Sequence, residues 1–418
     1  MQTLQQLKNG ELKGIKRLKL SEELTEFPLE ILELADTLEI LDLSHNRLQT
    51  LPCELSRLHK LKIAFFSNNL FTTVPTVFRN CENLYMLGFK ANQIEVFEED
   101  ILPLSISWLI LTDNKIKTLP YSMGKLEKLQ KCALAGNKIE VIPCSMASCV
   151  NLELLRLSAN NLIEIPTWLL KLPKLSWLAF SGNPCAVKSS AHLECVAYES
   201  LAIDRLLGEG ASGEIYKANA PTLECDVALK LFKGAVTSDG YAKDEMQAYM
   251  ATGEHPNLIK VLAKIEEKEH LGLLLELIPS TYINLGFPPD FDTCTRDTFK
   301  PHQKLTLGEV KTIASAIASA AQHLHARGLM HGDLYAHNIL VDTTAHAYLG
   351  DFGAASFYED NNNLYEKVEV RAFGCLLEDM LSLCDEKEDV GYSKLSVLVD
   401  KCMDKEVVKR PCFSEMDL

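Results

Sequence analysis

Apolar residues recur through the first half of the chain with a period of 22 or 23 residues. Each period has the order Leu-x-x-Leu-x-Leu-x-x-Asn, as at Leu38, Leu41, Leu43 and Asn46. One such unit cannot bury its leucines alone, so successive units are expected to stack into a solenoid with a continuous core. The repeating asparagines are Asn46, Asn69, Asn92, Asn114, Asn137, Asn160 and Asn183.

This pattern resembles the leucine-rich repeat over roughly residues 15 to 190, and we expect a repeat domain over residues 1–190. Each asparagine is expected to turn inward where the strand bends and to pair its amide with buried backbone groups. We therefore interpret the asparagines as structural rather than catalytic. Glu23 stands at the asparagine position of the first repeat, which indicates an atypical repeat that caps the array.

The candidate interaction surface of the repeats is their concave face, where alternate side chains of each strand point outward. The residues six and four positions before each asparagine form two columns on this face. Large exposed apolar patches often mark protein interaction sites. The alternative is a face that packs on a neighbouring domain or is simply apolar. The residues predicted to form an exposed apolar band for a protein ligand are Phe65, Trp108, Ile110 and Trp177.

The second half of the chain lacks this period, and its apolar runs predict separate strands and helices. A glycine-rich turn at 208–213 leads into a strand over 214–218. Glycines let a backbone approach phosphates closely and aim its N–H groups at them. Lys230 is the one charge in the apolar strand 227–232, so its burial requires a carboxylate partner. A helix rich in Ala and Ser is predicted over about 307–327.

A polar cluster follows that helix. Asp333 and Asn338 are five positions apart, and Asp351 begins the triplet Asp-Phe-Gly. These three side chains can place oxygen ligands around a metal-bound triphosphate. Oxygen donors suit Mg²⁺, which keeps several waters and takes one or two carboxylates plus substrate phosphates.

The glycine turn, the strand with Lys230 and the polar cluster occur in the order that a protein kinase requires. Residues 198–418 therefore resemble a protein kinase. The resemblance implies an α/β leucine-rich-repeat solenoid followed by an α+β two-lobed protein kinase-like domain. It also implies ATP and Mg²⁺ as cofactors, and a protein substrate.

The resemblance further implies roles for single residues. Asp333 matches the Asp that orients the substrate hydroxyl, and Asn338 and Asp351 match the metal ligands. Glu245 would hold Lys230 on the ATP phosphates, and the adjacent Asp244 is the alternative. The implied catalytic residues are Asp333, Lys230 and Glu245. The implied ATP-binding residues are Gly208, Glu209, Gly210, Ala211, Ser212, Gly213, Ile215, Ala228, Lys230, Leu275, Glu276, Leu277 and Ile278.

The catalytic loop departs from the family at three positions. Gly332 replaces the Arg that commonly meets a phosphate on the activation loop, which puts switching by loop phosphorylation in doubt. Tyr335 replaces a Lys that reaches the γ-phosphate in serine/threonine kinases, and His337 stands where tyrosine kinases commonly have an Arg. Neither acceptor class is indicated by these residues, and serine/threonine is favoured on prior frequency alone.

The activation segment is short, with eighteen residues from Asp351 to Glu369. Glu369 matches the acidic residue that starts a helix and braces the catalytic loop. No Ala-Pro-Glu triplet precedes it, although Arg410 resembles the Arg that such a Glu would pair with, and Glu366 is a possible stand-in. The irregular stretch 280–304 is interpreted as a surface insertion.

Charge, cysteine content and the distribution of apolar residues indicate which partners and which cellular compartment to expect. The net charge of −15 argues against nucleic acid or an anionic membrane as the main partner. The thirteen cysteines include no CxxC pair, which favours free thiols in a reducing compartment. The N-terminus has no signal-peptide core, and no run of about 18 apolar residues predicts a membrane span. These features predict a cytoplasmic protein.

Two readings of function remain. The first is an active protein kinase whose repeats bind a substrate or tether the enzyme to a partner. The alternative is a catalytically weak pseudokinase scaffold, in which the repeats and a nucleotide-binding domain serve protein interaction. Phosphorylation of a small molecule is a third possibility, compatible with a reduced platform for peptide substrates.

Overall fold

The computed structural model describes residues 2–187, 192–210, 212–233, 237, 239–359 and 363–418. The chain forms two compact units. The first consists of Met1–Leu172 and Asn183–Cys185, and the second of Pro173–Gly182 and Ala186–Leu418. The second unit thus includes Pro173–Gly182 and resumes at Ala186, whereas the sequence predicted a repeat domain over residues 1–190.

The predicted repeats form a parallel sheet with the strand order β1-β2-β3-β4-β5-β6-β7-β8. Each repeat contributes one three-residue strand in the same register as its neighbour, which confirms the solenoid. The strands are β1 Arg17–Lys19, β2 Ile40–Asp42, β3 Ile63–Phe65, β4 Met86–Gly88, β5 Trp108–Ile110, β6 Lys131–Ala133, β7 Leu154–Arg156 and β8 Trp177–Ala179.

Most strands of the first unit are followed by a short helix that has a proline directly before it. Proline fixes φ near the helical value and lacks an N–H, so it favours the start of a helical turn. The α-helices are α1 Leu4–Lys8 and α2 Thr167–Leu170. The 3₁₀ helices are Leu29–Leu34, Cys53–Arg57, Thr76–Asn80, Tyr121–Lys125 and Cys144–Ser148.

The asparagines form the internal ladder that the sequence predicts. Asn114 Nδ2 donates to Phe89 O in the preceding repeat at 2.9 Å and to Leu111 O at 3.0 Å. Its Oδ1 accepts from the Ile94 amide at 2.9 Å. One buried side chain thus satisfies three backbone groups that would otherwise be unpaired.

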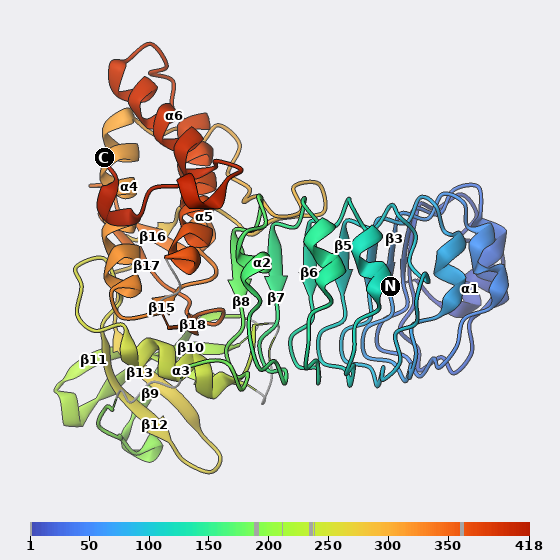
Figure 1. The fold of residues 1–418 in the computed structure, drawn as a ribbon. Helices are drawn as coiled ribbons and strands as arrows, with labels where there is room; N and C mark the ends of the chain where they lie inside the picture. Colours follow the sequence, from blue (N-terminus) through green and yellow to red (C-terminus); the bar gives the residue numbers. More distant parts are fainter. Residues whose placement is uncertain (1, 188–191, 211, 234–236, 238, 360–362) are drawn as a thin grey trace. The chain divides into compact units, whose positions relative to one another are not determined.

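The second unit contains an antiparallel sheet with the strand order β12-β13-β11-β10-β9. Figure 1 shows this sheet and helix α3 at one end of the unit, with α4, α5 and α6 at the other. The sheet strands are β9 Ala202–Glu209, β10 Gly213–Ala220, β11 Cys225–Phe232, β12 Val261–Glu266 and β13 Leu271–Glu276, and the helix is α3 Ala242–Ala251.

The helical end of this unit completes the two-lobed architecture. Its helices are α4 Leu307–His325, α5 Leu364–Ser382 and α6 Val390–Cys402. Its strands are β14 Ile283–Asn284, β15 Leu329–Met330, β16 Ile339–Val341, β17 Ala347–Leu349 and β18 Ser356–Phe357. The 3₁₀ helices of the second unit are Tyr198–Ser200, Pro221–Leu223, Ala336–Asn338, Val407–Lys409 and Phe413–Glu415.

Two details of the helical end bear on the sequence predictions. Helix α4 begins with a capping box between Thr306 and Glu309, close to its predicted start. Helix α5 begins at Leu364, so Glu369 lies in its second turn rather than at its start. Within the described ranges, no helix combines the length and apolarity that crossing a membrane requires.

Candidate functional site

Lys230 and Glu245 form a buried ion pair between β11 and α3. Lys230 is 5% exposed and Glu245 is 2% exposed, so water contributes little to solvating either charge. The structure thereby selects Glu245 over Asp244 as the partner of the lysine. Asp351 Oδ1 lies 3.9 Å from Lys230 Nζ, so the Asp-Phe-Gly triplet begins beside this ion pair.

The charge on Lys230 is maintained by its neighbours. Burial lowers the pKa of the ammonium, but Tyr249, Glu245 and Asp351 together raise it above its usual value. Burial raises the pKa of the Glu245 carboxyl, which the attraction of Lys230 opposes. The lysine therefore stays protonated and presents a fixed positive charge beside Asp351.

The glycine-rich turn connects β9 and β10, and its glycines differ in what they permit. A Cβ on Gly208 or Gly210 would meet no heavy atom within 4 Å, so the space over the turn is open. A Cβ on Gly213 would lie 2.1 Å from Leu231 O, which makes this glycine a requirement of strand packing. The backbone of Ser212 accepts from Lys233 N at 2.9 Å. The predicted site residue Ala211 lies outside the described residues.

A cavity of about 530 Å³ lies next to this sheet. Several of its lining residues belong to no motif that marks them in the sequence, among them Leu207, Ile259, Tyr282 and Leu340. The glycines and Lys230 are not among the lining residues. The predicted residues that line the cavity are Ile215, Ala228, Leu275, Glu276, Leu277 and Ile278. Its size and apolar walls suit a purine ring.

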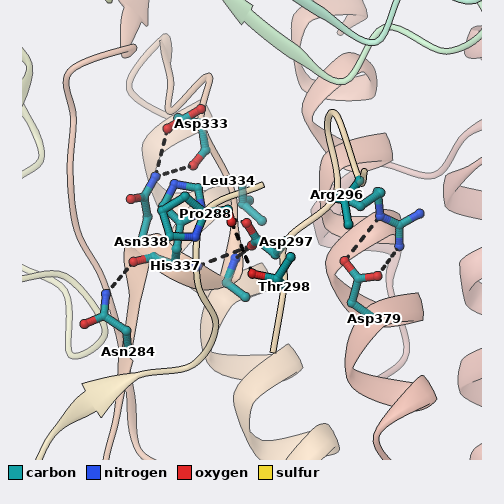
Figure 2. Close-up of polar contacts among 12 residues, drawn as sticks. Asn284, Pro288, Arg296, Asp297, Thr298, Asp333, Leu334, His337, Asn338 and Asp379 are labelled. Atoms are coloured by element: carbon teal, nitrogen blue, oxygen red, sulfur yellow. Dashed lines mark hydrogen bonds and ion pairs between the residues drawn. The ribbon is translucent and has the colours of Figure 1, made fainter. Parts of the chain in front are cut away.

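Asn338 fixes the catalytic loop around Asp333, as Figure 2 shows. Asn338 Nδ2 donates to the backbone O and to Oδ2 of Asp333, both at 2.9 Å. Both amide hydrogens of Asn338 are thereby directed to Asp333, which orients the amide oxygen away from it.

The oxygen donors fit Mg²⁺ held partly by a nucleotide. The side chain of Asp351 is 55% exposed, and its backbone has a φ of +56°, a conformation that is uncommon outside glycine. Among the described residues, no group of three His, Cys, Asp or Glu side chains could hold a metal alone. The carboxylate of Asp351 and the amide oxygen of Asn338 are oxygen donors, which suit a hard cation that completes its coordination with water and phosphate oxygens.

Glu369 braces the loop from α5, as predicted. Its Oε1 accepts from Gly332 N at 2.6 Å, and its Oε2 accepts from His331 N at 3.2 Å. His325 Nε2 lies 2.8 Å from the same carboxylate. Burial raises the pKa of Glu369, but His325, His331 and the Gly332 amide outweigh burial and hold it below its usual value.

The insertion at 280–304 holds the other side of the loop, which the sequence did not reveal. Asp297 Oδ2 accepts from Ala336 N at 2.5 Å, and Asp297 Oδ1 lies 2.6 Å from His337 Nδ1 (Figure 2). The adjacent Arg296 pairs with Asp379 of α5. In the sequence, an acidic residue beside a basic one in a Thr-rich stretch is too weak a signal to predict these contacts with the loop and with α5.

The apolar band on the repeats is corrected at two positions. Trp177 is 1% exposed and Trp108 is 9% exposed, so neither is the open contact residue that the columns predict. Trp177 stacks on Tyr335 in the second unit, and Lys131 Nζ lies 4.1 Å from the centre of the Trp108 ring. Phe65 and Ile110 are partly exposed.

The departures from the kinase pattern have local causes. Gly332 has a φ of +73°, and a Cβ there would lie 2.6 Å from Leu178 O and 2.7 Å from Ala354 O. An Arg at this position would therefore clash with backbone. Glu366 Oε1 accepts from the Phe413 amide at 2.8 Å, and no ion pair with Arg410 is found among the described residues.

Arg410 is 1% exposed and its guanidinium donates to carbonyl groups. The acceptors are Asp404 O at 2.9 Å, Lys367 O at 2.9 Å and Pro173 O at 2.7 Å. Burial and the positive charge of Arg371 lower the pKa of Arg410 to about 10. In the part of the chain that the structure describes, no carboxylate forms an ion pair with Arg410, and the negative charge of Asp404 offsets the lowering of its pKa only in part.

Comparison with known proteins identifies the same two parts. Residues 201–374 match the protein kinase domain, and residues 37–58 match the leucine-rich repeat. A putative L-type lectin-domain containing receptor kinase V.6 of Arabidopsis thaliana is 26% identical over 42% of this chain and 33% of its own length.

Two further relatives are each similar to less than half of the chain. Fibroblast growth factor receptor 1 of Xenopus laevis is 26% identical over 45% of this chain and 28% of its own length. The serine/threonine-protein kinase AtPK1/AtPK6 of Arabidopsis thaliana is 26% identical over 40% of this chain and 34% of its own length. The aligned part thus spans about a third of each relative or less.

Proposed function

Since this chain joins leucine-rich repeats to a protein kinase domain, we propose that it transfers the γ-phosphoryl group of ATP to hydroxyl groups of proteins. Two arrangements of side chains carry the proposal. The buried Lys230–Glu245 pair lies beside Asp351, and Asn338 holds Asp333 by two hydrogen bonds.

Each of these residues has a separate part in the proposed reaction. Lys230 presents a fixed positive charge to the phosphates, and Asp333 orients the incoming hydroxyl and accepts its proton. Asn338 and Asp351 would hold Mg²⁺, which when bound neutralises charge on the phosphate oxygens. The apolar cavity lined by Ala228 and Leu275 would take the adenine.

We further propose serine or threonine as the acceptor, supported by the relative named a serine/threonine-protein kinase. The repeats are proposed to bind a protein partner or substrate through the concave face near Phe65 and Ile110. A cytoplasmic location is also proposed. All thirteen cysteines lie in the described part of the chain and all are free, which favours a reducing compartment.

Transfer of labelled γ-phosphate from Mg-ATP to a generic protein substrate tests the proposal. The full chain is compared with Asp333→Ala, and Asp400→Ala on the exposed side of α6 serves as the matched control. We expect Asp333→Ala to lose about 10² to 10⁴ in rate, with nucleotide binding retained, since it removes the proton acceptor.

Acid hydrolysis of the labelled substrate then identifies the acceptor residue. Transfer that survives Asp333→Ala would overturn the assigned role of this carboxylate. A wild-type chain that binds nucleotide but transfers nothing would support the pseudokinase scaffold instead.

A further inference from the structure

The segment Pro173–Gly182 carries the last repeat strand, β8, yet it belongs to the same compact unit as residues 186–418. Its polar contacts with that unit follow one another along the segment. Pro173 O accepts from Arg410 Nη2 at 2.7 Å, and Ser176 Oγ accepts from Arg371 Nη1 at 2.6 Å. The segment is therefore fixed at its beginning by two buried arginines.

The middle of the segment contacts the catalytic loop on both sides of Asp333. Trp177 Nε1 donates to Leu334 O at 3.1 Å, and the Trp177 ring stacks on Tyr335 with 4.4 Å between ring centres. Leu178 O fills the space where Gly332 would otherwise carry a side chain. The backbone around the proposed catalytic carboxylate is thus held by two consecutive residues.

The end of the segment contacts two other parts of the site. Phe180 N donates to Ser356 Oγ at 2.9 Å, just after the Asp-Phe-Gly triplet. A Cβ on Gly182 would lie 2.5 Å from Asp244 Oδ2, at the start of the helix that carries Glu245. One ten-residue segment thus meets the catalytic loop, β18 and α3.

These contacts lie where the chain departs from the kinase pattern. The activation segment is short, Gly332 has no room for a side chain, and Arg410 takes a carbonyl of Pro173 among its acceptors. Tyr335, which stands in place of the usual Lys, is 4% exposed under Trp177. The departures are therefore matched by contacts from the same segment.

We propose that Pro173–Gly182 is a built-in brace that positions the catalytic loop, with Trp177 as its principal positioning residue. This inference rests on the proposed phosphotransfer. In this chain, a permanent internal contact would take the place of a phosphorylated activation segment. Misplacing a catalytic group by about 1 Å can cost about 10²-fold in rate, so loss of the brace should lower kcat strongly.

The test uses the full chain with Trp177→Ala and Trp177→Phe. The control is Trp168→Ala, which removes the same kind of side chain from the partly exposed helix α2 of the preceding repeat. The readouts are hydrogen exchange of the amides of 333–338, kcat, and KM for Mg-ATP. Exchange needs no catalytic activity, so it separates failure of the brace from failure of the proposed function.

We expect Trp177→Ala to accelerate exchange at 333–338 and to lower kcat by about 10²-fold, with KM for ATP within about threefold. Trp177→Phe should restore part of both, because it keeps a stacked ring while losing the N–H donor and some of the ring area. Trp168→Ala should change neither readout. Phosphatase treatment should leave wild-type kcat unchanged, since the brace needs no phosphate.

Unchanged exchange in Trp177→Ala would overturn the brace, as would an equal change in Trp168→Ala. If Trp177→Ala does not fold, Tyr335→Lys tests the same contact from the loop. If the brace positions the loop, Tyr335→Lys should show faster exchange and lower kcat. Higher kcat would instead show that the site lacks only the Lys that is usual at this position in the family. Altered exchange in a chain with no wild-type transfer would retain the brace and reject the proposed kinase activity.

Discussion

At the scale of single residues, burial decides which charges matter. Lys230 and Glu245 are both nearly inaccessible to water, and each is the other's counter-charge. Lys233 also forms ion pairs, with Glu209 and Glu214, but its side chain is 45% exposed. Exposed pairs contribute little to stability, whereas removing one partner of a buried pair leaves an uncompensated charge.

We therefore expect Glu245→Ala to lower the free energy of unfolding of the second unit by about 3–5 kcal/mol. Lys233→Ala should leave it close to the wild-type value. Denaturant titration followed by circular dichroism measures both. Equal effects of the two substitutions would show that the charge of Lys230 is compensated by other groups.

At the scale of elements, two adjacent asparagines of one repeat differ in burial and therefore in their expected contribution to stability. Asn160 is 3% exposed and its Nδ2 donates to Leu134 O at 3.0 Å and Leu157 O at 2.9 Å. Its Oδ1 accepts from Ile139 N at 3.0 Å. The next residue, Asn161, is exposed.

Asn160→Ala should therefore destabilise the repeats by about 1–3 kcal/mol for each buried group left unpaired, since water cannot replace the amide. Asn161→Ala is the adjacent control and should have little effect. Thermal unfolding of the full chain reports the difference. A small loss in Asn160→Ala would mean that water enters the ladder.

The insertion and the catalytic loop form a second case at this scale. Asp297 accepts hydrogen bonds from the loop, whereas Asp292 in the same insertion is exposed. We expect Asp297→Asn to lower kcat by at least about tenfold, with ATP affinity nearly unchanged, because it loosens the loop without touching the nucleotide. Asp292→Asn should keep wild-type kcat. An equal loss of kcat in both variants would exclude a specific role for the contacts of Asp297 with the loop.

At the scale of the whole molecule, burial decides the accessibility and the ionisation of each cysteine thiol. Burial raises the pKa of Cys81 and of Cys149 to about 11, while Cys53, Cys144, Cys195 and Cys225 are exposed. The thiolate is the reactive form, so burial suppresses reaction twice, by access and by ionisation.

Brief alkylation of the native protein at neutral pH should therefore modify the exposed four and leave Cys81 and Cys149 intact. Unfolding before alkylation should make all thirteen reactive, since every cysteine is free. Peptide mass spectrometry reads out each site. Rapid native labelling of Cys81 would show that the repeat core opens locally.

Features that depend on a local pattern of residues could be predicted from the sequence. The asparagine period identified the solenoid, because each repeat buries its leucines only against the next. The spacing of Asp333, Asn338 and Asp351 predicted the candidate site, because loop chemistry is carried by short motifs. Glu245 followed from the resemblance to kinases and was found paired with Lys230.

Contacts between residues far apart in the chain could not be predicted in this way, because folding brings the partners together. Trp177 fits the concave column of the repeats, yet it packs under Tyr335, 158 positions later. Asp297 and Pro173 likewise find their partners by folding. Periodicity specifies which face a side chain occupies, whereas its exposure depends on what another part of the chain places against that face.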